Sequence, residues 1–85
     1  MQKTIYFVYV LRNQEGRLYI GFTNNLERRV RQHQNGEGGW THNRGPWELA
    51  YHEVYEDRLT AMRRERELKK GKANNDLRLR FGAKV

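Results

Sequence analysis

The segment Ile5–Leu11 constrains the fold most, because it is apolar or aromatic at every position (IYFVYVL). In an extended chain, successive side chains point to opposite faces, so this segment presents apolar groups on both sides. A strand of this kind is typical of the interior of a sheet rather than of its edge. The segment therefore predicts a central strand that other parts of the chain cover on both faces.

The rest of the chain alternates turn signals with regular segments. Asn13–Gly16 predicts a turn, and Leu18–Phe22 predicts the returning strand of a hairpin. Gly21 inside that strand predicts a bulge or a close backbone approach. The expected later elements are a helix that Asn24 and Glu27 cap and Gly36 ends, a glycine-rich loop 36–46, a strand 47–55, a helix from Asp57 to about Lys70, and a short helix around 76–81. This β-β-α-β-α order predicts one α+β domain over residues 1–85.

Charge and cysteine content narrow the class of partner. The chain has a formal charge of +7 and no cysteine. A basic surplus attracts polyanions, and the basic helices lack the broad apolar face that a membrane surface would require, so we expect nucleic acid as the partner. Disulfides and thiolate metal sites are excluded, which fits a cytoplasmic protein. The N-terminal apolar run is too short for an export signal or a membrane span.

Residue spacing places an arginine and a histidine beside the buried side of the first predicted helix. A helix turns by about 100° per residue, so Leu26 and Val30 mark its apolar side and His33 falls between them. Arg29 borders this side of the helix. The other arginines of the helix, Arg28 and Arg31, are expected to point to solvent.

The second predicted helix carries one carboxylate in an unexpected position. Glu65 lies within the apolar stripe that includes Ala61 and Leu68, whereas Glu67 faces nearly the opposite way. An inward carboxylate is costly unless something compensates its charge. It either pairs with a cation such as Arg29 or holds a metal ion, and the spacing alone leaves both possibilities open.

Tyr9 and Tyr19 lie on the two predicted hairpin strands. Tyr19 shares a face with Gly21, which leaves space beside its ring. Taken singly, each tyrosine is more typical of a core residue whose hydroxyl reaches the edge of the core.

Together these residues resemble the signature of the GIY-YIG nuclease family. The resemblance rests on Tyr9, Tyr19-Ile20-Gly21, Asn24 through Arg29, His33, Arg44 through Trp47, Leu49, Tyr51, and Ala61 through Lys69. It covers about residues 5–72 and leaves a basic tail of 73–85. The chain looks like the small stand-alone bacterial members, a group similar to the N-terminal nuclease domain of the excision-repair endonuclease. The first triplet is Phe7-Val8-Tyr9 rather than Gly-Ile-Tyr, but only its tyrosine carries chemistry. The resemblance implies a three-stranded antiparallel sheet flanked by helices.

The resemblance also implies an endonuclease that hydrolyses DNA phosphodiester bonds with one Mg²⁺ or Mn²⁺ ion. Glu65 matches the carboxylate that holds the ion, and Arg29 matches the arginine that contacts the scissile phosphate. Tyr9 matches a general base or water-positioning group, and Tyr19 and His33 would orient this network. One inward glutamate is consistent with a single ion whose other ligands are water and phosphate oxygens.

A larger set of residues is predicted to hold the DNA. It comprises Arg28, Arg31, Trp40, His42, Arg44 and Lys69. Trp40 either stacks on a base or anchors its glycine-rich loop to the core. Some family members place an asparagine near the metal, for which Asn74 and Asn75 are candidates. The histidines lack the spacing of a zinc site.

Two other interpretations stay open. The chain could be a nucleic-acid-binding module that has kept the fold and lost cleavage, or an accessory subunit of a DNA repair complex that relies on a protein partner for its target. The intact set of residues matching the family signature argues against the first of these. The oligomeric state and the preferred DNA structure do not follow from the sequence.

Overall fold

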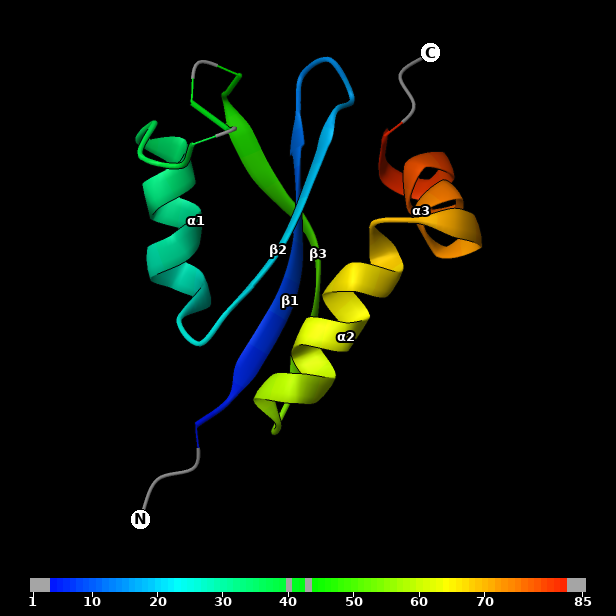
Figure 1. The fold of residues 1–85 in the computed structure, drawn as a ribbon. Helices are drawn as coiled ribbons and strands as arrows, with labels where there is room; N and C mark the ends of the chain where they lie inside the picture. Colours follow the sequence, from blue (N-terminus) through cyan, green and yellow to red (C-terminus); the bar gives the residue numbers. More distant parts are fainter. Residues whose placement is uncertain (1–3, 40, 43, 83–85) are drawn as a thin grey trace.

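A three-stranded antiparallel sheet lies at the centre of the fold, with β1 (Tyr6–Asn13) between β2 (Leu18–Thr23) and β3 (Trp47–Tyr55) (Figure 1). This computed structural model describes residues 4–39, 41–42 and 44–82. The predicted central strand is confirmed, because β1 pairs with a neighbour on either side. The predicted α+β class is confirmed as well.

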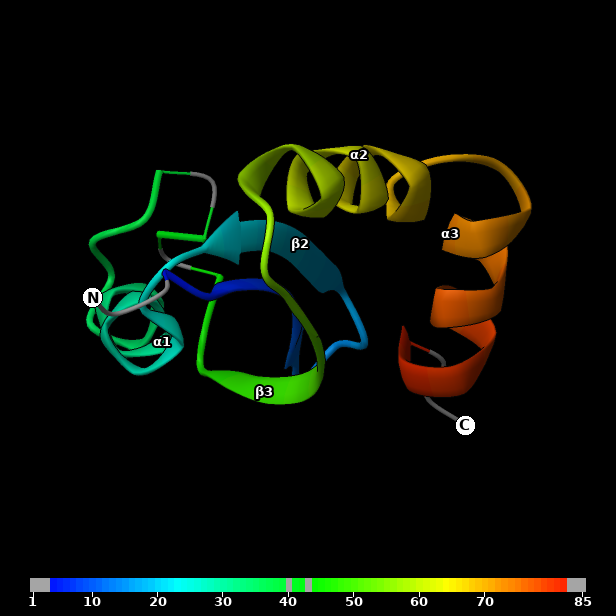
Figure 2. The same ribbon diagram turned by 90° about the horizontal axis from the view of Figure 1, so that it is seen from below.

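Helices cover both faces of the sheet. They are α1 (Leu26–Gln34), α2 (Arg58–Leu68) and α3 (Gly71–Leu77), which continues into a π-helical turn, η1 (Arg78–Gly82). Figures 1 and 2 show α1 and α2 on opposite sides of the sheet, with α3 beyond the end of α2. Among the residues that the structure describes, no helix is long and apolar enough to cross a membrane.

The central strand supplies side chains to two separate apolar clusters. On the α2 face the buried residues are Val8, Val10, Ile20, Ala61, Leu68 and Leu77. On the α1 face Tyr9, Leu11 and Trp47 are buried, with Tyr19, Leu26 and Val30 packed against them. Alternate residues of β1 therefore face opposite layers, which explains why the whole segment is apolar.

The cap of α1 differs by one residue from the expected one. Asn25, rather than Asn24, caps the helix, because its side chain accepts a hydrogen bond from the backbone N–H of Arg28 at 3.1 Å. At the other end, Gly36 has a φ of 78°, a left-handed conformation that favours glycine and ends the helix as expected.

The C-terminal third departs further from the expectation. Asp57 caps α2 as predicted, accepting from the backbone N–H of Thr60 at 2.8 Å. However, α2 ends at Leu68, and the next helix begins at Gly71 instead of near residue 76. Gly71 adopts a φ of 64°, so the chain turns there, and the new helix buries Leu77 against the core. The sequence did not predict this because the tail is mostly polar, and within its described residues only Leu77 is fully buried.

Candidate functional site

Tyr9 lies in β1 on the α1 face and is only 2% exposed. Its partner across the β1–β2 ladder is Gly21. A Cβ atom at position 21 would lie 2.6 Å from the Tyr9 hydroxyl oxygen, well inside contact distance. The β1–β2 register is regular here, so of the two alternatives expected for Gly21, a bulge or a close approach, the structure has the close approach. The glycine makes room for the phenol.

His33, in the last turn of α1, joins Tyr9 in a buried hydrogen-bonded chain. Its Nε2 lies 2.9 Å from the Tyr9 hydroxyl oxygen, and its Nδ1 lies 2.7 Å from the Thr41 hydroxyl oxygen. The ring of Tyr19 stands 4.7 Å from the His33 ring, centroid to centroid, and 6.2 Å from that of Tyr9. Residues from both strands of the hairpin and from α1 therefore form one aromatic group.

Arg29 stands one turn before His33 and is exposed. Within the described residues, its guanidinium forms no hydrogen bond or ion pair. It acts on the aromatic group electrostatically, because it lowers the pKa of both Tyr9 and His33. The structure thus places an exposed cation at the edge of this group.

Glu65 approaches the group from α2. Its side chain is 17% exposed, compared with 61% for Glu67, as the helical spacing predicted. Its Oε2 lies 3.1 Å from Nζ of Lys69, so the compensating cation in this structure is Lys69 rather than Arg29. The carboxylate also acts on Tyr9, whose pKa it raises.

The protonation states of the buried pair follow from these surroundings. Burial and then the neighbouring Tyr19 raise the pKa of Tyr9 far above its usual value, and Arg29 offsets only part of this effect. Burial and the charge of Arg29 lower the pKa of His33. At neutral pH, the phenol therefore keeps its proton and the imidazole is neutral.

Glu65 is the residue through which this site can hold a metal ion. Among the described residues there is no group of three or more His, Cys, Asp or Glu that could ligate a metal. A lone carboxylate suits a hard cation such as Mg²⁺ or Mn²⁺, which takes oxygen ligands and keeps much of its water. Glu65 fits this requirement because it is partly exposed and its ion-pair partner, Lys69, is itself half-exposed.

The residues predicted to hold DNA differ in the contacts that their side chains make. Arg28, Arg31, His42, Arg44 and Lys69 are all exposed, whereas Trp40 lies outside the described residues. Arg31 lies 3.9 Å from Glu27, and Nδ1 of His42 lies 2.7 Å from the backbone oxygen of Gly36. His42 is thus engaged within its own loop, which leaves the arginines of α1 better placed to contact a ligand.

Lys69 also lines a cleft of about 270 Å³ together with Tyr19 and Asn74. Asn74 donates from Nδ2 to the backbone oxygen of Leu68 at 2.9 Å, which satisfies the end of α2. Asn75 is exposed. Of the two candidate asparagines, Asn74 therefore borders the aromatic group, with its amide nitrogen already engaged.

Sequence reasoning missed Thr41, which is 1% exposed and bonded to His33. It lies in the glycine-rich loop between α1 and β3. A Cβ at Gly38 would lie 2.4 Å from both bonded atoms, so the loop packs directly on the bond between them. A threonine among glycines was a weak signal, because the path of a loop depends on distant contacts.

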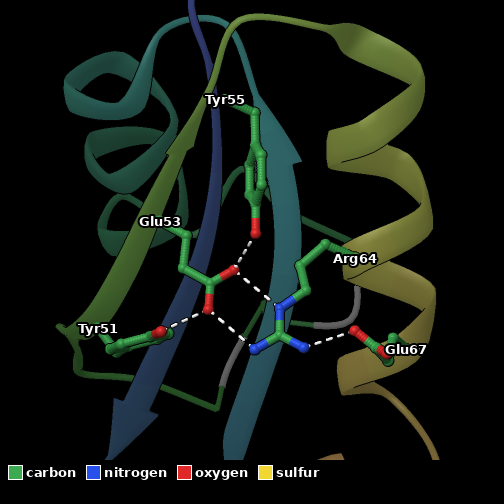
Figure 3. Close-up of polar contacts among 5 residues, drawn as sticks. All are labelled: Tyr51, Glu53, Tyr55, Arg64 and Glu67. Atoms are coloured by element: carbon green, nitrogen blue, oxygen red, sulfur yellow. Dashed lines mark hydrogen bonds and ion pairs between the residues drawn. The ribbon is translucent and has the colours of Figure 1, made fainter.

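A second cluster, also missed, ties α2 to β3 on the opposite face of the sheet (Figure 3). The Glu53 carboxylate accepts hydrogen bonds from the hydroxyls of Tyr51 and Tyr55. It also accepts from Nε and Nη2 of Arg64, at 2.9 and 3.0 Å. Arg64 directly precedes Glu65, so this cluster holds the helix segment that carries the candidate metal ligand.

Comparisons with known proteins find similar sequences and a similar fold over most of this chain. Residues 5–80 match the family model of the GIY-YIG catalytic domain. A UPF0213 protein of Clostridium perfringens is 43% identical over 74 residues, covering 86% of this chain and 80% of the relative. A UPF0213 protein of Natronomonas pharaonis is 45% identical over 65 residues, covering 75% and 76%. The solution NMR structure of a UPF0213 protein from Bacillus halodurans matches with a TM-score of 0.55 and 29% identity, covering 89% of this chain and 83% of that one.

Proposed function

The chain belongs to the GIY-YIG catalytic domain family, and from this membership we propose that it is a metal-dependent endonuclease acting on DNA phosphodiester bonds. The UPF0213 name of its relatives denotes no reaction, so the proposal depends on the site itself. One observation carries it: Tyr9 is hydrogen-bonded to His33 in a buried pair, and both the exposed Arg29 and the carboxylate of Glu65 act on it electrostatically.

Arg29 is proposed to bind the scissile phosphate. Its guanidinium is exposed and unpaired within the described residues, so no ion pair has to break before it binds an anion. The planar fork of an arginine can donate two parallel hydrogen bonds to phosphate oxygens and offset the charge that develops there.

Glu65 is proposed to hold one Mg²⁺ or Mn²⁺ ion, which would supply charge neutralisation at the phosphate when bound. In the free protein Lys69 neutralises Glu65, and its flexible stem lets it turn instead toward the DNA backbone. The proposed DNA surface thus runs from the arginines of α1 to Lys69 at the end of α2.

Tyr9 is proposed to accept the proton of the attacking water, with Tyr19 and His33 orienting it. The raised pKa of Tyr9 means that the free protein holds it as a phenol, so it must lose its own proton before it can accept one. Arg29 favours this loss, since a nearby positive charge stabilises the phenolate. The reactive form is therefore expected to arise only when the site is loaded.

Cleavage of supercoiled plasmid in Mg²⁺ or Mn²⁺ tests the proposal directly. We expect the wild-type protein to nick the plasmid and Glu65→Gln to lose at least about 100-fold in rate, because the variant cannot hold the cation. Glu67→Gln is the matched control: it removes the same charge two residues away, from a 61% exposed side chain, and should still nick. Circular dichroism establishes that both variants fold.

Each of the other outcomes has a definite meaning. Nicking by Glu65→Gln at the wild-type rate would remove the carboxylate from the mechanism. DNA binding by the wild type without nicking would favour the second candidate, a nucleic-acid-binding module or an accessory subunit that gains cleavage or target choice beside a protein partner.

A further inference from the structure

Thr41 has a buried hydroxyl that, among the described residues, has one hydrogen-bonding partner. Its Oγ1 lies 2.7 Å from Nδ1 of His33, and the residue is 1% exposed. No other hydrogen bond to this hydroxyl is formed within residues 4–39, 41–42 and 44–82. The tautomer of His33 therefore depends on whether Oγ1 of Thr41 or Nδ1 of His33 supplies the hydrogen of this bond.

The surrounding loop is built around this hydrogen bond. Gly38 packs so closely that a Cβ would lie 2.4 Å from both Nδ1 and Oγ1, which leaves no space for water on that side. The backbone oxygen of Thr41 accepts a hydrogen bond from the indole Nε1 of the buried Trp47 at 3.0 Å. Threonine is thus fixed from both sides, and its side chain has little freedom to find another partner.

The hydrogen bond between Thr41 and His33 has two possible directions, which differ in the number of polar hydrogens that are left without an acceptor. If His33 donated from Nδ1, the hydroxyl would accept, and its own hydrogen would be buried without an acceptor in the described residues, which is costly. If the hydroxyl donates to Nδ1, both groups are satisfied. A neutral imidazole that accepts at Nδ1 carries its hydrogen on Nε2.

We propose that Thr41 is a positioning residue, which donates its hydroxyl hydrogen to Nδ1 of His33 and so keeps the imidazole hydrogen on Nε2, facing the Tyr9 oxygen. His33 then donates to Tyr9 across the 2.9 Å contact, and the hydroxyl hydrogen of Tyr9 turns away, toward Tyr19. The effect of Thr41 on catalysis rests on the proposed nuclease function, whereas the tautomer of His33 does not. A hydrogen bond donated to the Tyr9 oxygen favours the phenolate that would accept the proton of water.

The nitrogen atoms of His33 report the predicted tautomer without any need for cleavage. In ¹⁵N-labelled protein near neutral pH, we expect Nε2 to resonate as a protonated, pyrrole-type nitrogen and Nδ1 as an unprotonated one shifted by an accepted hydrogen bond. Replacing His42 and His52 one at a time with glutamine assigns the signals. In Thr41→Val the Nδ1 signal should move to the position of a nitrogen without a hydrogen bond, and Thr41→Ser should restore it.

Two spectral outcomes would overturn the proposal: a hydrogen on Nδ1 in the wild type, or an unchanged Nδ1 signal in Thr41→Val. If Thr41→Val fails to fold, the wild-type and Thr41→Ser spectra still decide the tautomer. These readouts are independent of nuclease activity, so they distinguish failure of this inference from failure of the proposed function.

The catalytic consequence has its own measurement. With plasmid as substrate, Thr41→Val should lower kcat by about ten-fold, in line with the loss of one buried hydrogen bond, and leave KM unchanged because the residue is inaccessible to DNA. Thr41→Ser should cleave close to the wild-type rate. Full activity of Thr41→Val alongside a shifted Nδ1 signal would overturn the positioning role.

Discussion

At the scale of single residues, the site depends on positions where a side chain is missing. Gly21 lies opposite Tyr9 in the sheet, and Gly38 lies against the bond between His33 and Thr41. Both glycines allow close approach, because a Cβ would meet site atoms at 2.6 Å and 2.4 Å respectively. Their role is therefore to make space rather than to provide flexibility.

Gly21→Ala should disable the site by displacing Tyr9. The added methyl group would overlap the phenol oxygen, and the ring could move only by breaking its bond to His33. We expect a loss of about 1 to 3 kcal/mol in the free energy of unfolding, measured by urea denaturation, together with loss of plasmid nicking. Gly39→Ala is the matched control, since nothing lies within 4 Å of a Cβ there.

Adding Tyr9→Phe to Gly21→Ala separates the two effects. Removal of the hydroxyl relieves the closest overlap, so the double variant should regain part of the lost stability while it stays inactive. A fully stable Gly21→Ala protein that nicks DNA like the wild type would show that β2 can shift to accommodate the methyl group.

At the scale of elements, local patterns predicted the strands better than they predicted the ends of the helices. The limits of β3 matched the prediction, because Pro46 precedes the strand and Asp57 caps the helix after it. The predicted cap of α1 and start of α3 were wrong. Either Asn24 or Asn25 can cap a helix, and in the described part of the tail Leu77 is the one fully buried residue.

In the candidate site, too, features set by spacing within one helix could be predicted, whereas contacts between elements could not. Spacing within α2 distinguished Glu65 from Glu67, whose side chains are 17% and 61% exposed. The pairing of His33 with Thr41 and that of Glu53 with Arg64 could not be predicted, because each joins different elements through side chains that have no local pattern.

Glu53→Gln should weaken the attachment of α2 to β3 and remove an acid-sensitive part of the stability. Burial alone would raise the pKa of Glu53, but the hydrogen bonds from Arg64, Tyr51 and Tyr55 outweigh it and hold the pKa at about 2, below the ordinary value of 4.5. A depressed carboxylate pKa stabilises the fold above pH 4.5, and this contribution is lost as the pH falls toward 2.

Urea denaturation at a series of pH values measures this effect. The wild type should lose stability between pH 4.5 and 2, whereas Glu53→Gln should be about 2 to 3 kcal/mol less stable at neutral pH and change less over that interval. Glu48→Gln is the control, because its carboxylate is 63% exposed in its pair with Arg12 and should contribute less than about 1 kcal/mol. Parallel pH curves for wild type and Glu53→Gln would contradict the expectation.

At the scale of the whole molecule, charge is distributed unevenly along a chain of net charge +7. Residues 47–57, which form β3 and the cap of α2, contain acidic residues and no lysine or arginine. The arginines of α1 lie on the helix that also supplies His33, and Lys69 directly follows α2, the helix that supplies Glu65. A polyanion should therefore approach the α1 side and the end of α2, and avoid the edge of the sheet that β3 forms.

DNA binding should consequently weaken steeply with salt and depend on α1. With EDTA present to prevent cleavage, Kd measured at several salt concentrations should give a log–log slope that Arg28→Ala reduces by about one, because one phosphate contact and its released counterion are lost. Lys72→Ala in α3 removes the same charge from an 89% exposed side chain paired with Asp76, and should leave the slope nearly unchanged. Equal reductions in both variants would mean that DNA responds only to net charge, with no defined path across α1.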